Sequence, residues 1–575
     1  MNQRINLMPV DDPRNRHARE CARRQVSWPV NLTPASVSYS SQGHTLILGN
    51  ERCARRAARA LREAGLPSPT LLYTEPTPST GAIPVDDDKQ DERLLHDTGD
   101  LNSQTLSPAQ ARDLRIDGYL GRFTASLVRD GSLLDLAKAL TGREHFDLVL
   151  DLGTTPILAL ELSPPGYVRA SHDNGTLDSA VEELAGLVGE FDKPRYFQIN
   201  QDLCAHASSG NTGCTRCLEV CPADAIASHQ ERIEAWIEID PFRCHGIGSC
   251  TSACPTGAIQ FRLPETQRQQ DTLLAWLAAY REAGGSTPVV RFGEAEDLAS
   301  EEDSAGHVLD IPLEELGAAG HDQWLTALAG GAAEVRIQYR ADMPERLVAF
   351  LDDQLAQAQA LLEAMGHAKE RIKRIEAGDN IARDALPSHP PLDSKPLAFD
   401  TTSKRERLNG VLACLLECGT PDGYRHSMPS GAAYGGLDVD TDACTLCMAC
   451  VANCPTPALA AGDDHPLLSF READCVQCGL CVHACPEDAI ALAPGFLADN
   501  AREQRRVCHE EAPFECIHCG KPFATASTIA NIKAKLADHP YFAGQAMARL
   551  EMCEDCRVRD VWQELAHDPE SQLKV

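Results

Sequence analysis

Two cysteine runs with identical internal spacing constrain this chain of 575 residues more than any other feature. Each has the form C-x-x-C-x-x-C-x-x-x-C-P, and the two comprise Cys444, Cys447, Cys450 and Cys454-Pro455, then Cys475, Cys478, Cys481 and Cys485-Pro486. Three thiolates on one tight loop can bind three irons of a single cubane, whereas the fourth, which precedes proline, is directed to the cluster of the other run. The spacing therefore predicts two [4Fe-4S] clusters.

We expect the two runs to exchange their last ligands. One cluster takes Cys444, Cys447, Cys450 and Cys485, and the other takes Cys475, Cys478, Cys481 and Cys454. Disulfides or zinc sites are the alternatives, but neither is typical of matched runs of four cysteines. The pair has the signature of a ferredoxin. Small residues and one Ile or Leu follow each last cysteine, as in CPEDAIA, and predict a short helix there.

An imperfect copy of this pattern lies at residues 204–254. Its first half contains Cys214, Cys217 and Cys221-Pro222, but Asn211 stands where the leading cysteine belongs. Cys204 lies seven residues upstream of that position, across a Gly- and Ser-rich loop that is able to bend. The predicted ligands of one cluster are therefore Cys204, Cys214, Cys217 and Cys254.

The second half of the copy lacks one cysteine, because Ile247 occupies that position. Only Cys221, Cys244 and Cys250 remain for the other cluster. Three thiolates hold a [3Fe-4S] cluster, or an incomplete [4Fe-4S] cluster whose last iron binds water or a neighbouring group. His245 adjoins the gap and is either a nitrogen ligand or a solvated side chain. Absence of this cluster is a further alternative.

A third cysteine pattern lies near the end of the sequence. Two C-x-x-C pairs flank a predicted helix at about residues 527–537 and comprise Cys516, Cys519, Cys553 and Cys556. Four thiolates paired in this way form a tetrahedral zinc site, and the absence of a following proline disfavours another cluster. Cys508 is a spare thiol nearby. The remaining cysteines match no pattern and are interpreted as buried or incidental: Cys21, Cys53, Cys414 and Cys418.

Two segments between the cysteine patterns have α/β character. In the first, HTLILG from His44 and FDLVLDLG from Phe146 predict buried strands, with a helix at 51–64 and another strand near Leu71. The turn Gly49-Asn50-Glu51 lacks G-x-G-x-x-G, so a scaffold or docking role is favoured over a flavin or nicotinamide site.

The second α/β segment covers residues 287–378. Strands are predicted at PVVRF, HVLDI and EVRIQY, with helices around Trp324 and from Pro344. A helical stripe is interpreted as core packing and comprises Leu347, Leu351, Leu355, Ala358, Leu362 and Met365. The acidic stretches 86–100 and 294–303 are expected to be exposed loops.

These observations predict an α+β and α/β multidomain protein. The expected units are an N-terminal tail at 1–43, a Rossmann-like α/β domain at 44–195, a first ferredoxin-like module at 196–265, a second α/β domain at 266–379, a linker at 380–435, a second ferredoxin-like module at 436–497 and a zinc-ribbon-like module at 498–575.

The charge and the sequence near the N-terminus bear on partners and location. The chain has 53 basic and 84 acidic residues, a formal net charge of −31, which argues against nucleic acid as a partner. Such a surface suits an electron carrier that docks on a basic patch, or reflects ordinary acidic solubility. The first residues have no secretory h-region, and no apolar run is long enough for a membrane span, so the cytoplasm is expected.

Several segments resemble one protein family. CAHASSGNTGCTRCLEVCP, FDLVLDLG followed by ELSPPGY, CTLCMACVANCP, PFECIHCGKPF and MCEDC are similar to the large cytoplasmic polyferredoxins encoded beside bacterial formate dehydrogenases. The resemblance implies electron transfer coupled to formate oxidation, with the cluster ligands named above. Ile247 departs from the family pattern, which has cysteine at this position.

Three functions are compatible with the sequence. The first is an electron-transfer protein that relays single electrons through up to four clusters, with formate dehydrogenase as its redox partner. The second is a cofactor-binding subunit of a larger oxidoreductase, and the third is a maturation or docking factor for a molybdenum formate dehydrogenase. No catalytic constellation stands out, so an electron-transfer component is favoured over an independent enzyme.

Overall fold

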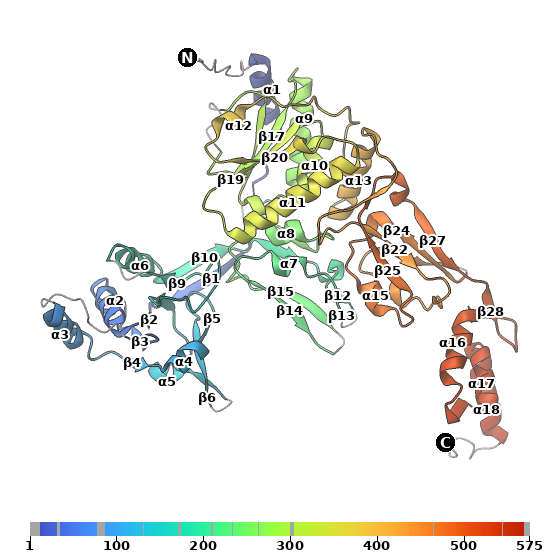
Figure 1. Cartoon of the computed structure of the whole chain (residues 1–575), viewed down its shortest axis with the longest axis horizontal. Coiled ribbons are helices and arrows are strands. Elements are labelled where there is room, and N and C mark those ends of the chain that lie inside the picture. Colours follow the sequence, from blue (N-terminus) through green and yellow to red (C-terminus); the bar gives the residue numbers. More distant parts are fainter. Residues whose placement is uncertain are drawn as a thin grey trace.

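The computed structural model describes residues 12–30, 35–76, 87–129, 132–170, 174–208, 211–232, 234–262, 264–298, 304–463, 465–542 and 544–567. Figure 1 shows a central unit with one arm on each side. Residues from about 36 to 194 form one arm, and the second ferredoxin-like module and the C-terminal helices form the other. No helix among these residues is long and apolar enough to cross a membrane.

The first arm contains a five-stranded parallel sheet of order β4-β3-β2-β8-β9. Its strands are β2 Thr45–Gly49, β3 Thr70–Tyr73, β4 Ser103–Thr105, β8 Leu148–Asp151 and β9 Tyr167–Arg169. The buried strands β2, β3 and β8 lie where the apolar runs predict them, and α2 (Glu51–Glu63) follows β2 as expected. The acidic stretch from residue 86 was expected to be a loop, but α3 (Asp87–Asp97) occupies most of it. Residues 299–303 of the other acidic stretch lie outside the described residues.

The first arm also has smaller elements. They are α4 Pro108–Asp113, β5 Arg115–Asp117, β6 Thr124–Arg129, β7 Ser132–Asp135, α5 Leu136–Thr141 and α6 Asn174–Gly186. An antiparallel ribbon of β1 (Ser36–Ser41) and β10 (Gly189–Pro194) joins this arm to the centre, with Ser36 opposite Pro194. The first and last strands of the arm therefore lie side by side.

The central unit is built on a second parallel sheet, of order β18-β17-β19-β20. Its elements are α9 Thr266–Glu282, β17 Val289–Glu294, β18 Val308–Leu313, α10 His321–Ala329, β19 Glu334–Tyr339, α11 Glu345–Ala364 and β20 Ile372–Glu376. The three predicted strands and both predicted helices are confirmed. The apolar stripe of α11 packs in the core, with Leu351, Ala358 and Leu362 fully buried.

Part of the segment 1–43, which is expected to be an N-terminal tail, is a packed helix. Residues 13–25 form α1 (Pro13–Gln25), which packs along α9 of the central unit (Figure 1). Ala18 and Ala22 are fully buried, and their small side chains allow the two helices to approach closely. The guanidinium of Arg19 donates to the carbonyl oxygens of Ala305 and Val308 at 2.9 and 3.2 Å.

The segment 380–435, expected to be a linker, also contains part of the core. It includes α12 (Asn380–Asp384) and α13 (Lys404–Glu417). Val411, Leu412 and Leu415 of α13 are fully buried against the central unit. The prolines between residues 387 and 396 correctly indicate an irregular segment, but the apolar periodicity that follows them marks a core helix.

The two ferredoxin-like modules repeat one arrangement of elements. The first contains β11 Phe197–Ile199 paired with β16 Ile259–Phe261, β14 Ile226–Gln230 paired with β15 Ala235–Ile239, and the short helices α7 Arg216–Glu219 and α8 Ser249–Ala253. The second contains β22 Gly435–Val439 paired with β25 Ile490–Pro494, β23 Leu459–Ala461 paired with β24 Leu467–Arg471, and the helices α14 Ala449–Ala452 and α15 Leu480–Ala484.

The helix predicted after each last cysteine is wrong. The Ile or Leu at these positions instead enters a strand, in β14, β16, β23 and β25. The short helices lie before the last cysteine of each run.

The C-terminal part follows β27 (Arg505–Glu510), which extends the sheet of the second module. It contains β28 Pro513–Glu515, β29 Pro522–Thr525, α16 Ala526–Leu536, α17 Gln545–Ala548 and α18 Glu554–His567. The predicted helix near residues 527–537 is α16. Thr525 and Thr528 both donate to the carbonyl oxygen of Thr445, and Lys535 pairs with Glu487 at 2.9 Å. These contacts attach the C-terminal part to the second module.

Candidate metal centres

The cysteines of the two modules form the four predicted ligand sets, which we name sets A to D. Set A is Cys221, Cys244 and Cys250; set B is Cys204, Cys214, Cys217 and Cys254; set C is Cys454, Cys475, Cys478 and Cys481; set D is Cys444, Cys447, Cys450 and Cys485. The electrostatic effect of each thiol on its neighbours indicates which of them lie together.

Set B is completed by a hairpin. The strands β12 (Ala207–Ser208) and β13 (Asn211–Thr212) fold back on each other, and the N–H of Cys214 donates to the carbonyl oxygen of Ala205 at 3.1 Å. The ring of His206 fixes this turn, because Nδ1–H donates to the carbonyl oxygen of Cys214 at 2.8 Å. Burial raises the pKa of Cys217, and the thiols of Cys254, Cys214 and Cys204 raise it further. The structure therefore brings Cys204 to the cysteines that it was predicted to join.

Set A has three thiols, and the fourth position faces the protein core. Burial raises the pKa of Cys250 well above its ordinary value, and the thiols of Cys244 and Cys221 add to the effect. The side chain of Ile247 packs against the core of the central unit. At the next residue, Gly248, a Cβ atom would come within 2.6 Å of Ala318, so this loop lies directly on the short helix Leu316–Ala318.

Two further side chains adjoin set A. His245 is half-buried rather than freely solvated, and its Nε2–H donates to the carbonyl oxygen of Ser163 at 2.9 Å. Burial lowers the pKa of this ring, which favours the neutral form with its lone pair on Nδ1. Lys193 donates to the carbonyl oxygens of Phe242 and Cys244 at 3.0 and 2.9 Å.

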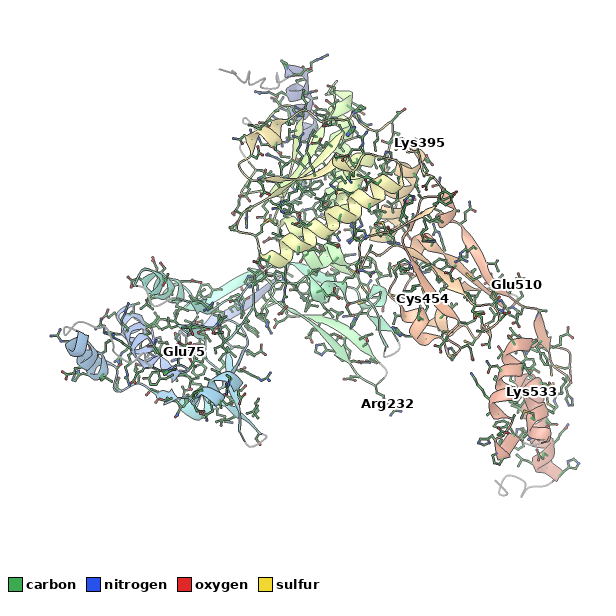
Figure 2. The ribbon with its side chains drawn as sticks, viewed as in Figure 1. Glu75, Arg232, Lys395, Cys454, Glu510 and Lys533 are labelled. Carbon is green, nitrogen blue, oxygen red and sulfur yellow. The ribbon has the colours of Figure 1, made fainter. Side chains whose placement is uncertain are left out.

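Sets C and D each draw one thiol from the other run. Burial raises the pKa of Cys478, and the thiol of Cys454, labelled in Figure 2, raises it further. Burial likewise raises the pKa of Cys450, with contributions from Cys444, Cys447 and Cys485.

Residues with positive φ shape the loops of sets C and D. Leu446, Met448 and Gln477 have φ of 54°, 61° and 52°, which allows the loops to wind tightly. The amide of Gln477 donates to Sγ of Cys475 at 3.2 Å.

The four sets follow one another through the molecule. Cys217 and Cys254 of set B lie within electrostatic reach of Cys250 in set A. Cys214 of set B acts on Cys478 of set C, although the two belong to different modules. Cys450 of set D acts on Cys481 of set C. The order is therefore A, B, C, D, with the module boundary between B and C.

Set D is the most accessible. Cys447 is exposed, whereas the other cysteines of the four sets are buried or half-buried. The sequence did not predict this difference between Cys447 and Cys478, which occupy equivalent positions in their runs.

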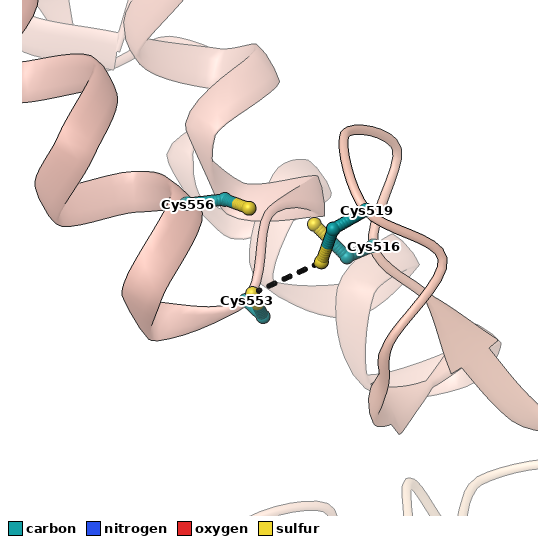
Figure 3. A group of neighbouring side chains, drawn as sticks. All are labelled: Cys516, Cys519, Cys553 and Cys556. Carbon is teal, nitrogen blue, oxygen red and sulfur yellow. Dashed lines mark hydrogen bonds between the residues drawn. The ribbon is translucent and has the colours of Figure 1, made fainter.

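The last two cysteine pairs form a separate group (Figure 3). The sulfur atoms of Cys516, Cys519, Cys553 and Cys556 all lie within 4.8 Å of one another. The first pair lies in the turn between β28 and β29, and the second lies at the start of α18. The pKa of Cys516 is lowered to about 6: burial opposes this change, but hydrogen bonds from the backbone N–H groups of Cys553, His518 and Cys519 outweigh it. A thiolate is the form that binds metal.

The remaining cysteines lie apart from this four-sulfur group. Cys508 packs against the core of the second module, near Cys444. Cys21, Cys53, Cys414 and Cys418 are half-buried, and within the described ranges none of them joins the four-sulfur group.

Three cationic side chains at these sets were not predicted from the sequence. Arg216 lies between Cys214 and Cys217, so its position between two ligands could have indicated it. Lys193 and Arg405 lie outside the cysteine runs, and only the fold brings them to sets A and C.

Comparison with known families identifies a domain type for each of the two modules. Residues 212–258 and 442–490 each match a family described as a 4Fe-4S dicluster domain. No curated protein matches the chain. The first match begins at Thr212, so Cys204 and most of the hairpin that follows it lie outside the match. The chain thus contains two ferredoxin-type dicluster domains and is an iron–sulfur protein with a mixed helix and strand architecture.

Proposed function

We propose that this iron–sulfur protein relays single electrons through four clusters that are held in the order A, B, C, D. The continuity of the four cysteine sets across the module boundary is the observation that carries the proposal. A cluster supplies reversible one-electron chemistry, and the protein fixes its neighbours and its potential. An electron-transfer role is supported by the two dicluster domains.

The proposed ligands are the cysteines of each set. Sets B, C and D each hold a [4Fe-4S] cluster through four thiolates, and set A holds a [3Fe-4S] cluster through three. The packing of Ile247 against the central core supports the smaller cluster, because no fourth thiol approaches from that loop. Burial of these thiols disfavours the charged form unless iron binds it, so the sites are suited to metal rather than to free thiolates.

We assign zinc to the C-terminal group of four cysteines. Four thiolates without an open position are typical of structural zinc. Contacts from Thr525 and Thr528 to Thr445 connect this site to the loop of set D. The zinc site therefore stabilises the end of the relay at which Cys447 is exposed.

The proposed partner is a formate dehydrogenase, and the proposed location is the cytoplasm. Both rest on the resemblance to polyferredoxins encoded beside such enzymes. The exposed thiol of Cys447 makes set D the end at which a redox protein can approach a cluster most closely.

A nucleotide site in the first arm is not favoured. The side chain of Asn50 is buried and accepts a hydrogen bond from the N–H of Cys53 at 3.0 Å. This backbone donor at the start of α2 is therefore not available to a phosphate. Glu75, labelled in Figure 2, accepts from the N–H of Thr154 at 2.7 Å. The carboxylate of Glu75 lies at the sheet edge where the phosphate of a nucleotide would bind, and its negative charge would repel that phosphate.

The relay is tested by anaerobic stopped-flow mixing of the chain with formate dehydrogenase and formate. We expect the visible absorbance of all clusters to bleach together in the wild-type chain. In Cys478→Ala, which interrupts set C, only the clusters on the entry side are expected to bleach rapidly. Clusters that dithionite reduces but the dehydrogenase leaves oxidised would contradict the proposal.

A further inference from the structure

The boundary between sets B and C contains a guanidinium that contacts both modules. Nη1 of Arg216 donates to Sγ of Cys214 at 3.4 Å and to the carbonyl oxygen of Val476, within the loop of set C, at 3.2 Å. Nε donates to the carbonyl oxygen of Gly431 at 2.7 Å. Arg216 therefore joins a cysteine of set B to the loop of set C.

A second guanidinium lies beside the first. Arg405 of α13 is 6 % exposed and donates to the carbonyl oxygens of Ala473 and Cys475 at 2.8 and 2.6 Å. Burial lowers its pKa, and the nearby charge of Arg216 lowers it too, whereas Tyr434, Cys475 and Asp474 act in the opposite direction. Two positive groups are thus placed together between two cysteine sets.

The carboxylates near this boundary are engaged elsewhere. Both arginines line a cavity of about 130 Å³ that also contains Glu219 and Asp353. Glu219 accepts from Thr215 at 2.9 Å and Asp353 from Gln357 at 2.6 Å. Asp322, which also lines the cavity, lies 3.8 Å from Lys404, and Asp474, whose charge acts on Arg405, pairs with Arg471 at 3.2 Å. Across the described ranges, no carboxylate hydrogen-bonds the guanidinium of Arg216 or Arg405.

Burying the guanidinium of Arg405 without a counter-charge is costly, and the nearby positive charge of the half-buried Arg216 adds to that cost. Clusters ligated by four thiolates are anionic, and sets B and C place two of them at this boundary. Clusters in these two sets would supply the counter-charge that no hydrogen-bonded carboxylate provides at either guanidinium. The arginines thus fit the presence of a cluster in both sets.

We propose that Arg216 and Arg405 are the shared counter-charges of the clusters in sets B and C and raise the reduction potential of both. The proposal rests on the relay proposed above. Reduction adds negative charge to a cluster, so a nearby positive charge and a hydrogen bond to sulfur both stabilise the reduced state. An electron is thereby stabilised on the clusters in sets B and C, at the boundary between the two modules.

The test is a redox titration of the complete chain followed by EPR, with the signals of sets B and C assigned as those lost in Cys217→Ala and Cys478→Ala. In Arg216→Met and Arg405→Met, we expect both midpoint potentials to fall. At the wild-type midpoint, the ratio of reduced to oxidised cluster should decrease about tenfold per removed charge. Arg216→Lys and Arg405→Lys retain the charge and should remain near wild type.

A matched control is Arg346→Met. Arg346 also donates to a cysteine carbonyl, that of Cys221, at 2.8 Å, but it is ion-paired with Asp224. Because this charge is already neutralised, its loss should leave the midpoint potentials of the clusters in sets B and C unchanged. A methionine variant that fails to incorporate clusters while the lysine variant incorporates them also supports the counter-charge role.

If the methionine variants keep their full iron content and the midpoint potentials of sets B and C do not shift, the inference is overturned. That result is distinguishable from failure of the relay, in which the potentials shift as expected but formate dehydrogenase does not reduce the chain.

Discussion

The ammonium group of Lys193 donates a hydrogen bond to the backbone carbonyl oxygen of Cys244, at a distance of 2.9 Å. The lysine lies on β10, in the ribbon that connects the first arm, whereas the cysteine belongs to the first ferredoxin-like module. Burial lowers the pKa of Lys193 to about 8, and Cys244 and Asp240 oppose this shift. The first arm thus places a cation against set A.

Replacing this cation should change the potential of the cluster in set A. In Lys193→Met, the midpoint potential should fall by on the order of 50 mV, because a positive charge that favours the reduced state is lost. EPR-monitored redox titration measures the change. Lys193→Arg is the control and should remain near wild type; equal potentials in the methionine and arginine variants would count against the electrostatic explanation.

Ile247→Cys should supply the missing thiolate of set A. We expect the iron content to rise from about fifteen to about sixteen per chain, and the signal of an oxidised three-iron cluster to disappear. Iron analysis and EPR of the oxidised protein test this. Ile247→Val preserves an apolar side chain and should change neither quantity. Sixteen irons in the unmodified chain would show that set A already holds a four-iron cluster.

Cys204→Ala should remove one ligand of set B and destabilise its cluster. The expected loss is up to about four irons per chain, whereas Cys21→Ser, in α1, should lose none. Iron and sulfide analysis after anaerobic purification provides the comparison. Full iron content in Cys204→Ala would mean that another group supplies the fourth ligand.

Cys553→Ala should reduce zinc without reducing iron. The four-sulfur group is separate from sets A to D, so zinc should fall from about one equivalent to near zero while the iron content is retained. Metal analysis measures both elements in one sample. Proteolysis should then cleave the C-terminal part faster, because structural zinc contributes to its folding. Cys508→Ala, which alters a nearby cysteine outside the group, should retain its zinc.

The stability of the central unit should depend on pH through Glu315. Burial, together with the carboxylate of Glu294, raises the pKa of this carboxyl to about 7. Its ordinary value is about 4.3, so between pH of about 4.3 and 7 the folded state binds a proton that the unfolded state releases. The free energy of unfolding therefore decreases as the pH rises through this window.

Glu315→Gln should remove this dependence. At pH 8 we expect the variant to be more stable by roughly 1 kcal/mol, after allowance for solvent screening of a half-buried group. The apparent melting temperature at pH 5 and pH 8 tests the prediction. Glu314→Gln, at the exposed neighbouring position, is the control. A wild-type chain that is more stable at pH 8 than Glu315→Gln would contradict the sign.

Much of the candidate site was predictable because its geometry is encoded locally. The spacing of cysteines identified the two dicluster modules, and the seven-residue gap before Asn211 indicated that Cys204 replaces the missing cysteine. The hairpin β12–β13 folds the chain back so that Cys204 can reach the other cysteines of set B. Buried parallel strands such as β2 and β17 were also evident, because they consist of short, continuous apolar runs.

What could not be predicted depends on contacts between distant segments. Arg405 lies nearly seventy residues before Ala473, and no local pattern indicates that its side chain reaches set C. The arginine-rich α1 has no strong apolar stripe, and its burial depends on α9, which lies far along the chain. Proline-rich residues near α13 concealed a core helix for the same reason.

The packing of α1 against α9 has a consequence for synthesis on the ribosome. Roughly 240 residues separate the end of one helix from the start of the other, which at a typical elongation rate corresponds to about 12 to 50 seconds. During this interval α1 lacks its partner, while the whole first arm, whose two ends meet at Ser36 and Pro194, can already fold. The nascent chain therefore completes its outer arm before its central unit can close.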